Sequence, residues 1–363
     1  MVTIQVQRLI DFVTEVFAHA QSSPQEARRI ATYLTTANLT GHDSHGVIRV
    51  PVYIRWQKSG SVVPNQTAEV VLDTPSLAVV DGKFGYGQIV TPQAVRIGID
   101  KCRKAGLAAV ALRNAGHIGR VGDWAEMAAA EGLVSVHFVN AAGSLLVAPF
   151  GGVEKRLSTA PYCVGIPRPG QDPIVLDFAT SVVAEGKVLV ASRGGKKLPK
   201  GALVDADGSL SEDPAVLYGP YTAEGPRDHT RGTGAIRAFG EHKGSGLALI
   251  CELVAGALTG SGCAGPGPRR FCNGMLSIYM APGQFGSAEE LAAETTRYID
   301  YFKACRPAEA GGEVLLPGEP EARRRAERIA GGVTLTDEVW RSLGETARAG
   351  GLDIARYPTL PAA

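Results

Sequence analysis

The chain has 363 residues, of which 45% are hydrophobic and 20% are charged, so it is long enough for two closely packed lobes with a sizeable core. Its 37 lysines and arginines nearly balance its 36 aspartates and glutamates, which argues against nucleic acid or an anionic membrane as the partner. We expect a small-molecule substrate instead.

The six cysteines are scattered and include no C-x-x-C pair, so the sequence predicts reduced thiols and no metal site. The N-terminal segment carries Arg8, Asp11 and Glu15 within a helical period, which does not fit a signal peptide. The most apolar helix candidate, residues 247–258, is interrupted by Glu252 and is too short to cross a bilayer. The sequence therefore predicts a cytoplasmic protein without a membrane segment.

The predicted elements alternate between helix and strand through the first half of the chain. A helix begins near Val6, and Ser23 to Glu26 has the pattern of a capping box before a second helix. Two helix-to-strand units follow, with turns at Gly106 and Gly132. Their predicted ranges are helix 94–104 with strand 107–112, and helix 123–132 with strand 133–139. With further strands at 162–166 and 174–178, this alternation predicts an α/β fold with a largely parallel or mixed sheet.

The second half is predicted to end in helices. An apolar helix runs through Leu258, and a capping box at Ser287 to Glu290 begins a helix that ends near Cys305. Charged helices are expected from about Glu319 and Asp337.

A G-x-G-x-x-G pattern occurs at Gly260, Gly262 and Gly265. A dinucleotide-binding fingerprint needs a strand before it and a helix after it. Here a predicted helix precedes the pattern and a proline-rich run follows, so we expect an ordinary loop. A dinucleotide would have to bind by other means.

Residues 41–49, GHDSHGVIR, gather two imidazoles, a carboxylate, a hydroxyl and a guanidinium. Moving a hydride from an alcohol carbon requires a base for the hydroxyl proton, and histidine titrates near neutral pH. Arg49 offers two parallel hydrogen bonds to a carboxylate. The alternative is structural, with Asp43 and Ser44 capping a helix and both histidines on the surface.

Two other polar segments stand where strands end or a helix begins. Residues 114–120, NAGHIGR, follow a predicted strand, and Asp177 lies at the end of another. Ligands of open α/β sheets bind beyond the carboxyl ends of strands, although plain turns would look similar. Residues 239–246, FGEHKGSG, place Lys243 at the start of the apolar helix, where a phosphate would bind favourably. The alternative is a surface lysine on a glycine-flanked helix.

Six motifs in order resemble the malate/L-lactate dehydrogenase family, which includes sulfolactate, ureidoglycolate and hydroxycarboxylate dehydrogenases. They are SHGVIR, NAGHIGR, VAPFGG, LDFATSVVAEGKV, LPKGALVDADG and FGEHKGSGLAL. The resemblance implies a mixed seven-stranded sheet flanked by helices, which is sulfolactate-dehydrogenase-like and not a standard Rossmann domain. It also implies a homodimer, NAD or NADP as cofactor, and a 2-hydroxy acid as substrate. A cyclic imine reductase is the alternative that the family allows.

The resemblance also assigns residues and lobes. His45 is the expected acid/base with His117 as its rival, in one pocket with Ser44, Arg49 and Tyr53. The residues expected at the cofactor are His117, Gly119, Arg120, Thr159, Asp177, Phe178, Ala179, His242, Lys243, Gly318, Glu319 and Pro320. A discontinuous helical lobe from residues 1–115 and 300–363 is expected to serve substrate and dimer contacts, and residues 116–299 to bind NAD(P).

The chain departs from the family in one motif. Where the family usually has glycine, threonine, asparagine and proline, this chain has Ser158, Thr159, Ala160 and Pro161. The asparagine amide is lost, which puts the exact substrate in doubt.

Overall fold

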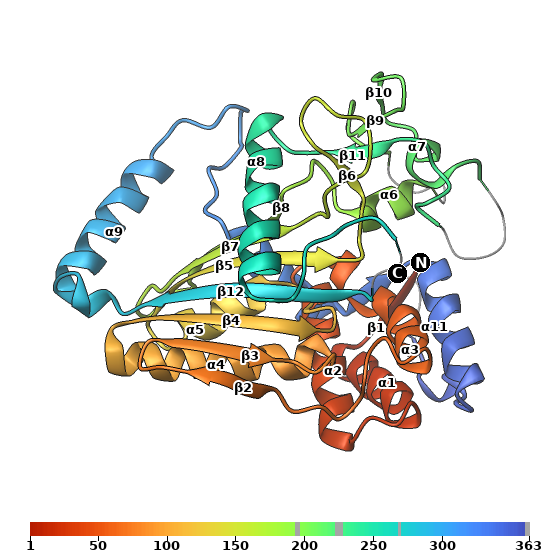
Figure 1. The fold of residues 1–363 in the computed structure, drawn as a ribbon, viewed down its shortest axis with the longest axis horizontal. Helices are drawn as coiled ribbons and strands as arrows, with labels where there is room; N and C mark the ends of the chain where they lie inside the picture. Colours follow the sequence, from red (N-terminus) through yellow and green to blue (C-terminus); the bar gives the residue numbers. More distant parts are fainter. Residues whose placement is uncertain (193–196, 222–227, 268–269, 360–363) are drawn as a thin grey trace.

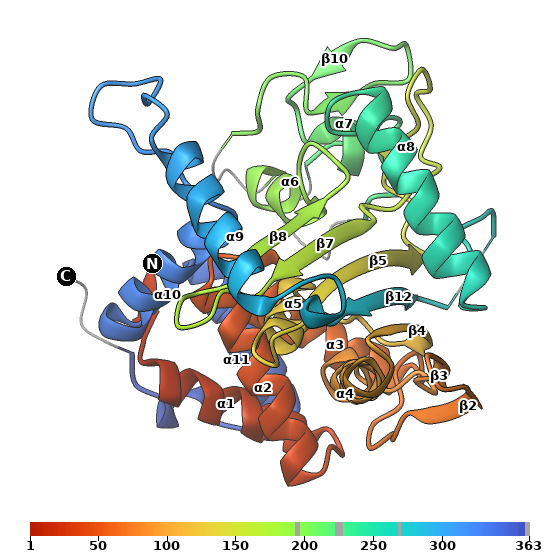
Figure 2. The same ribbon diagram turned by 90° about the vertical axis from the view of Figure 1, so that its left-hand side faces the viewer.

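The two ends of the chain form one helical part in the computed structural model, which describes residues 1–192, 197–221, 228–267 and 270–359. Strand β1 (Val2–Ile4) pairs antiparallel with β13 (Val333–Leu335) and joins these ends. The helices of this part are α1 (Val6–His19), α2 (Pro24–Leu39), α3 (Val50–Lys58), α10 (Glu319–Gly331) and α11 (Asp337–Ala349). They enclose a core that includes Phe12, Phe17 and Leu343, and they lie together at one end of the molecule (Figures 1 and 2).

Helix α2 begins at the predicted cap, but only half of the capping box forms. The Ser23 hydroxyl accepts a hydrogen bond from the Glu26 amide. The Glu26 carboxylate instead accepts hydrogen bonds from the Ser22 hydroxyl (2.7 Å) and the Asn65 amide (2.8 Å). The carboxylate therefore ties α2 to the segment that follows α3. At α9 (Ala288–Lys303) the predicted box between Ser287 and Glu290 is complete.

A mixed seven-stranded sheet forms the centre of the molecule, in the order β2-β3-β4-β12-β5-β7-β8. The strands are β2 (Glu69–Asp73), β3 (Leu77–Asp81), β4 (Leu107–Ala115), β12 (Cys272–Met280), β5 (Val134–Ala142), β7 (Pro161–Ile166) and β8 (Ile174–Ala179). Helices α4 (Gly87–Ala105) and α5 (Gly122–Ala129) cover one face, and α8 (His242–Cys251) lies on the other (Figure 2). The predicted helix-to-strand units are confirmed, with Gly106 left-handed at the end of α4 (φ 79°).

Strand β12 changes the expected pairing of these units. It lies between β4 and β5 and runs antiparallel to both. Strands β4 and β5 therefore point the same way without pairing. Among the described strands of this sheet, only β3 and β4 pair in parallel. The mixed sheet is confirmed, but the strand that separates β4 from β5 begins more than 150 residues after β4 ends.

The boundary expected at residue 115 does not separate a helical lobe from a sheet lobe. Strands β2, β3 and β4, all before this residue, are three of the seven strands of the central sheet. They belong there because β4 pairs with β12 along its length. The helical part is accordingly smaller than residues 1–115 with 300–363, and α9 (Ala288–Lys303) crosses the other expected boundary, at residue 299. Which part serves substrate, cofactor or dimer contacts stays a prediction.

A smaller part carries a four-stranded sheet in the order β10-β9-β11-β6. Its elements are β6 (Val147–Ala148), α6 (Glu185–Ser192), β9 (Leu203–Val204), β10 (Leu210–Ser211), α7 (Ala215–Tyr218) and β11 (Ala235–Arg237). After it, α8 continues as a π-helix, Glu252–Leu258, and leads into the loop that holds Gly260, Gly262 and Gly265, as predicted. No helix among the described residues is long and apolar enough to cross a membrane.

Candidate active site

Two short 3-10 turns, Asp43–His45 and Val47–Arg49, carry the motif GHDSHGVIR. Asn38 at the end of α2 holds them, since its side-chain oxygen accepts a hydrogen bond from the Val47 amide (2.9 Å) and its amide donates to Asp43 (2.7 Å). Gly46 has to be glycine, because a Cβ there would lie 2.3 Å from that Asn38 oxygen. Neither Asp43 nor Ser44 caps these turns, so the helix cap of the structural alternative does not form.

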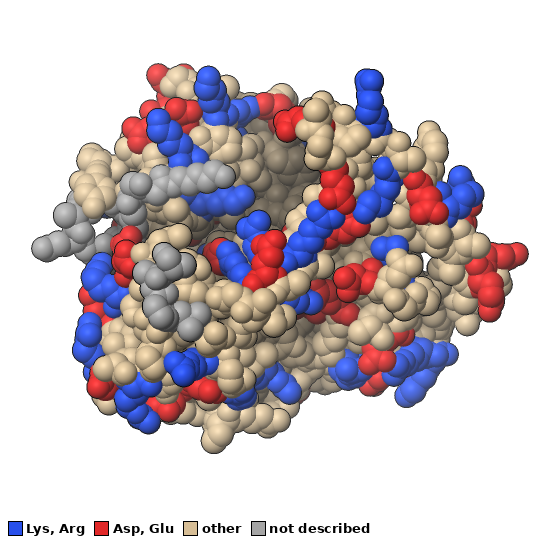
Figure 3. Space-filling view, turned by 180° about the vertical axis from the view of Figure 1, so that it is seen from behind, with Lys and Arg blue, Asp and Glu red and all other residues tan. Residues whose placement is uncertain are grey.

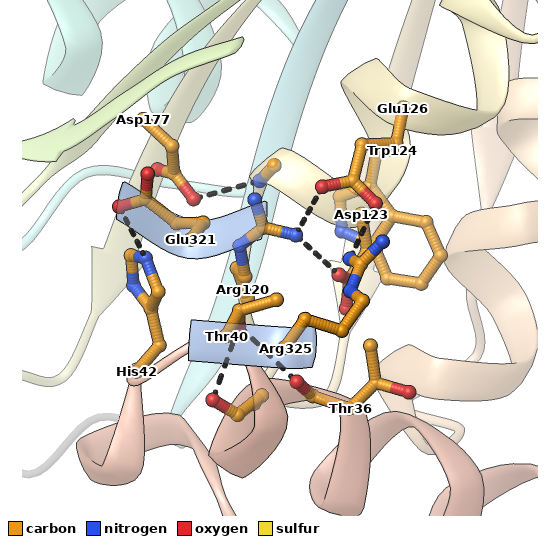
Figure 4. Close-up of polar contacts among 12 residues, drawn as sticks. Thr36, Thr40, His42, Arg120, Asp123, Trp124, Glu126, Asp177, Glu321 and Arg325 are labelled. Carbon is orange, nitrogen blue, oxygen red and sulfur yellow. Dashed lines mark hydrogen bonds and ion pairs between the residues drawn. The ribbon is translucent and has the colours of Figure 1, made fainter. Parts of the chain in front are cut away.

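Helix α10 holds the same loop from the other side. Arg328 forms an ion pair with Asp43 (2.7 Å) and donates to the carbonyl of Asn38. The His42 ring lies 3.5 Å from the carboxylate of Glu321 (Figure 4). The loop is therefore fixed between the first helices and the last ones.

The structure brings the rings of His45 and His117 together. They stack almost parallel, with centroids 5.3 Å apart and planes inclined by 7°. Burial and the nearby positive charge of Arg49 lower the pKa of His45 to about 3. The same two causes hold the pKa of His117 well below its usual range. Both rings are therefore neutral near pH 7.

Tyr53 lies beneath this pair, where the sequence placed it, together with a residue that the sequence did not indicate. The Tyr53 hydroxyl is 2.5 Å from Nδ1 of His117. Gln88 near the start of α4 donates a hydrogen bond to the same hydroxyl (2.9 Å). Gln88 belongs to none of the recognised motifs, so only the fold could reveal it.

Arg49 and Ser44 lie at the edge of this pocket, close to the smaller part of the molecule. The guanidinium of Arg49 donates to the Ser44 carbonyl (2.6 Å) and lies 3.8 Å from the Glu185 carboxylate. Glu185, at the start of α6, also accepts a hydrogen bond from Tyr218. Gly186 packs closely on Ser44, since a Cβ would be 2.6 Å from that side chain. Glu185 is a site residue that the sequence reasoning missed, although it lies within a quoted motif.

Arg120 is buried inside a cluster of ion pairs. Its side chain is 1% exposed and pairs with Asp123 (2.9 Å) and Glu126 (2.7 Å), and Glu126 also binds Arg325 (2.9 Å; Figure 4). Burial alone would lower the pKa of Arg120, but the surrounding carboxylates raise it above its ordinary value. The Arg120 side chain is thus already engaged by carboxylates of the chain, and its contact with the cofactor stays a prediction.

Several of the remaining residues expected at the cofactor lie on β8 or on elements next to it. Asp177 accepts a hydrogen bond from the Gly122 amide (2.7 Å; Figure 4). The Phe178 ring packs on the Phe239 ring, with their centroids 5.2 Å apart. Phe239 leads into α8, which begins with His242 and Lys243. The others are Ala179 at the end of β8, Thr159 just before the paired strand β7, Gly119 beside Gln88, and Gly318, Glu319 and Pro320 at the start of α10.

One of these expected residues, Glu319, is already engaged within the chain, and so is the backbone of Ala160. Glu319 pairs with Lys303 (2.5 Å) and accepts a hydrogen bond from the Leu316 amide (2.9 Å). Ala160, which replaces the family's asparagine, is buried, and its carbonyl accepts a hydrogen bond from the Thr180 hydroxyl (2.8 Å). The backbone here is therefore held without the missing amide.

A cavity of about 540 Å³ lies beside Gly318, between α5, α10 and the hairpin that joins β7 to β8. Its lining includes Val175, Glu321 and Arg325. This volume is within the usual range for a small-molecule site. Figure 3 shows a hollow on one face of the molecule, with basic and acidic side chains both at its margin. Among the described residues, no group of three histidines, cysteines or acidic residues could hold a metal ion.

Known proteins similar to this chain match it over nearly its whole length. The profile of the malate/L-lactate dehydrogenase family matches residues 4–344. Hydroxycarboxylate dehydrogenase B of Escherichia coli K12 is 38% identical over 351 residues, covering 95% of this chain and 94% of that protein. A Delta(1)-pyrroline-2-carboxylate/Delta(1)-piperideine-2-carboxylate reductase of Pseudomonas syringae pv. tomato is 32% identical, and the match covers 95% of this chain and 96% of that protein.

Solved structures agree with the fold. A putative malate/lactate dehydrogenase from E. coli superimposes with a TM-score of 0.89 at 37% identity, covering 98% of this chain and 97% of that one. Sulfolactate dehydrogenase from Methanocaldococcus jannaschii superimposes with a TM-score of 0.83 at 32% identity, and the match covers 98% of this chain and 99% of that one. The predicted sulfolactate-dehydrogenase-like sheet is confirmed. The chain belongs to the malate/L-lactate dehydrogenase family and is an enzyme of the dehydrogenase class.

Proposed function

We propose that this chain transfers a hydride between NAD or NADP and a small 2-hydroxy acid, interconverting the acid with its 2-oxo acid. The observation that supports this most strongly is the stacked pair of neutral imidazoles, His45 and His117, beside Arg49. An oxidation of this kind needs one group that exchanges a proton and one that holds a carboxylate. The family membership of the chain supports the same reaction class.

In this proposal Arg49 binds the substrate carboxylate and His45 exchanges the proton of the C2 hydroxyl. A neutral His45 is ready to accept that proton when the hydroxy acid is oxidised. In the reverse direction it has to carry a proton first. Because the positive charge of Arg49 helps to lower the pKa of His45, a carboxylate bound to Arg49 would offset that charge and raise the pKa.

The residues around β8 and the start of α8 fit a dinucleotide. The first turn of α8 has no side-chain cap, and Lys243 is exposed there, so a cation lies at the positive end of the helix dipole, where a phosphate binds favourably. Gly244 lets the start of α8 pack tightly on the preceding backbone, since a Cβ there would lie 2.3 Å from the Phe239 carbonyl. Asp177 to Ala179, His242, Lys243 and Gly318 to Pro320 would hold NAD or NADP. When bound, its nicotinamide supplies the hydride donor or acceptor.

Substitution of His45 tests the proposed roles. His45→Ala should retain cofactor binding and lose turnover by about a hundredfold or more, the usual contribution of acid/base catalysis. His117→Ala should be prepared in parallel and measured with the same 2-oxo acid. Near-normal turnover of His45→Ala together with a larger loss in His117→Ala would move the proton-transfer role to His117.

A cyclic imine reductase is the second candidate, and one observation favours keeping it. The Pseudomonas syringae reductase is 32% identical to this chain over 354 residues, and its reaction on a ring that bears a carboxylate would need the same arginine, proton carrier and hydride. The two candidates separate in an assay that offers 2-oxo acids and cyclic imine carboxylates side by side with NADH or NADPH.

We also propose that the protein is a cytoplasmic homodimer. All six cysteines are free thiols, which fits a reducing compartment. Helix α9 stands away from the sheet (Figure 1) and exposes Tyr298, Tyr301 and Phe302, while the π-helix exposes Leu253 and Leu258. Apolar surface of this extent usually marks an interface. Light scattering during gel filtration should give twice the mass of one chain, and the mass of a single chain would contradict the dimer.

A further inference from the structure

The hydroxyl of Tyr53 lies between three polar groups inside the protein. The side-chain amide of Gln88 donates to it (2.9 Å), Nδ1 of His117 is 2.5 Å away, and the His117 carbonyl is 3.3 Å away. Tyr53 and Gln88 are each 1% exposed. These contacts are therefore shielded from bulk water. Which group donates in each hydrogen bond follows from the number of hydrogens that the groups carry.

The hydroxyl has a single hydrogen to donate. Burial raises the pKa of Tyr53, so the hydroxyl keeps this hydrogen at neutral pH. The carbonyl at 3.3 Å lies beyond the usual O–H···O range of about 2.5–3.0 Å, whereas Nδ1 at 2.5 Å is close. The hydroxyl therefore donates to Nδ1 of His117, and that nitrogen carries no hydrogen of its own.

The direction of the hydrogen bond between Tyr53 and His117 depends on which end of the Gln88 amide faces the Tyr53 hydroxyl. In the structure the nitrogen faces the hydroxyl, and the buried Gln88 oxygen has no partner among the described residues. In this orientation the oxygen and one of the two amide hydrogens lack a partner among the described residues. If the amide were reversed, the oxygen would accept from Tyr53 and both amide hydrogens would lack an acceptor. Because unsatisfied buried donors are costly, the observed orientation is favoured.

We propose that Gln88 is a positioning residue that acts through Tyr53 to fix His117 as the tautomer with hydrogen on Nε2. His117 then presents a permanent hydrogen-bond donor from the side of its ring away from Tyr53, fit for a substrate oxygen. This leaves His45 as the group that exchanges the proton, because two stacked rings 5.3 Å apart resist being charged together. The division of roles rests on the proposed function, but the tautomer does not.

The tautomer can be read directly by NMR on the free protein labelled with ¹⁵N-histidine. Long-range ¹H–¹⁵N correlations distinguish hydrogen on Nε2 from hydrogen on Nδ1, and His117→Gln identifies the signals. We expect His117 to be neutral with hydrogen on Nε2. Hydrogen on Nδ1 in the unsubstituted protein would overturn the inference. The spectrum needs no substrate, so a protein with the expected tautomer that reduces no 2-oxo acid would contradict only the proposed function.

Gln88→Met tests the positioning role, since methionine has a similar size but cannot donate to Tyr53. We expect the Nδ1–H form of His117 to become populated, kcat to fall about tenfold or more, and cofactor affinity to stay unchanged. Gln93→Met on the same helix is the control, because the Gln93 side chain bonds Ile89 and Ala68 and does not reach Tyr53. A Gln88→Met protein with pure Nε2–H and an unchanged kcat would overturn the positioning role.

Discussion

Replacing Arg120 by methionine should destabilise the protein strongly, because it leaves a buried carboxylate without its main partner. Asp123 is 6% exposed and pairs with Arg120 at 2.9 Å. Removing one partner of a buried ion pair typically costs about 3–5 kcal/mol. Glu126 retains Arg325 (2.9 Å), so most of the loss should arise at Asp123. A loss of this size is a large part of the roughly 5–15 kcal/mol by which folded domains are stable.

The loss should depend on pH in a direction that follows from Asp123. Burial raises the pKa of Asp123 from its ordinary 3.8 to about 6, against the opposing effect of Arg120. The folded protein thus binds this proton more tightly than the unfolded chain, so ionised Asp123 lowers stability above pH 6, and this cost disappears as the pH falls toward 3.8. The difference corresponds to about 3 kcal/mol, at about 1.36 kcal/mol per pH unit. Without Arg120 the cost above pH 6 increases.

Guanidinium unfolding followed by circular dichroism at pH 5 and pH 8 measures both effects. Arg120→Met should lose more stability at pH 8 than at pH 5, and adding Asp123→Asn should recover part of the loss. Arg156→Met is the matched control, since Arg156 and its partner Glu154 are 61% and 69% exposed and exposed pairs contribute little. A loss in Arg120→Met no larger than the control, or one that grows at low pH, would refute this reasoning.

Three further substitutions have defined outcomes. Arg49→Lys should raise KM for a 2-oxo acid about tenfold or more, because lysine lacks the planar fork that binds a carboxylate; steady-state kinetics with an unchanged KM would exclude Arg49 as the carboxylate ligand. Lys243→Met should weaken NADH or NADPH binding in a fluorescence titration without lowering Tm, since this side chain is exposed at the uncapped start of α8, and equal affinity would remove Lys243 from the cofactor site. Gly46→Ala should reduce both Tm and kcat, because the new Cβ would lie 2.3 Å from the Asn38 side chain; a protein with wild-type values would show that the His45 loop is less tightly held than the structure indicates.

Local signals in the sequence located most helices and strands. Gly106 ends α4 in the left-handed conformation, and the box at Ser287 begins α9, because each pattern is satisfied by neighbours along the chain. The order of the strands could not be read in this way. Strand β12 inserts between β4 and β5, and no local pattern specifies a partner so far away in sequence.

In the candidate site, too, some residues could be predicted from local sequence and others could not. His45, Arg49, Tyr53 and His117 lie in or beside dense polar motifs, and the structure places them together. Gln88 and Asn38 lie in helices of ordinary appearance, and their roles depend on which loops the fold brings against them. The burial of Arg120 among carboxylates could not be predicted, because a sequence motif shows which residue is present but not what surrounds its side chain.

The most direct test of the central claim follows the hydride itself. The protein is incubated with NADH or NADPH carrying deuterium at the transferable C4 position and with a panel of 2-oxo acids and cyclic imine carboxylates, and the products are analysed by mass spectrometry. We expect a 2-hydroxy acid with one deuterium at C2, formed by the unsubstituted protein and lost in His45→Ala. Deuterium found only in a cyclic amino acid, or in no product at all, would contradict this expectation.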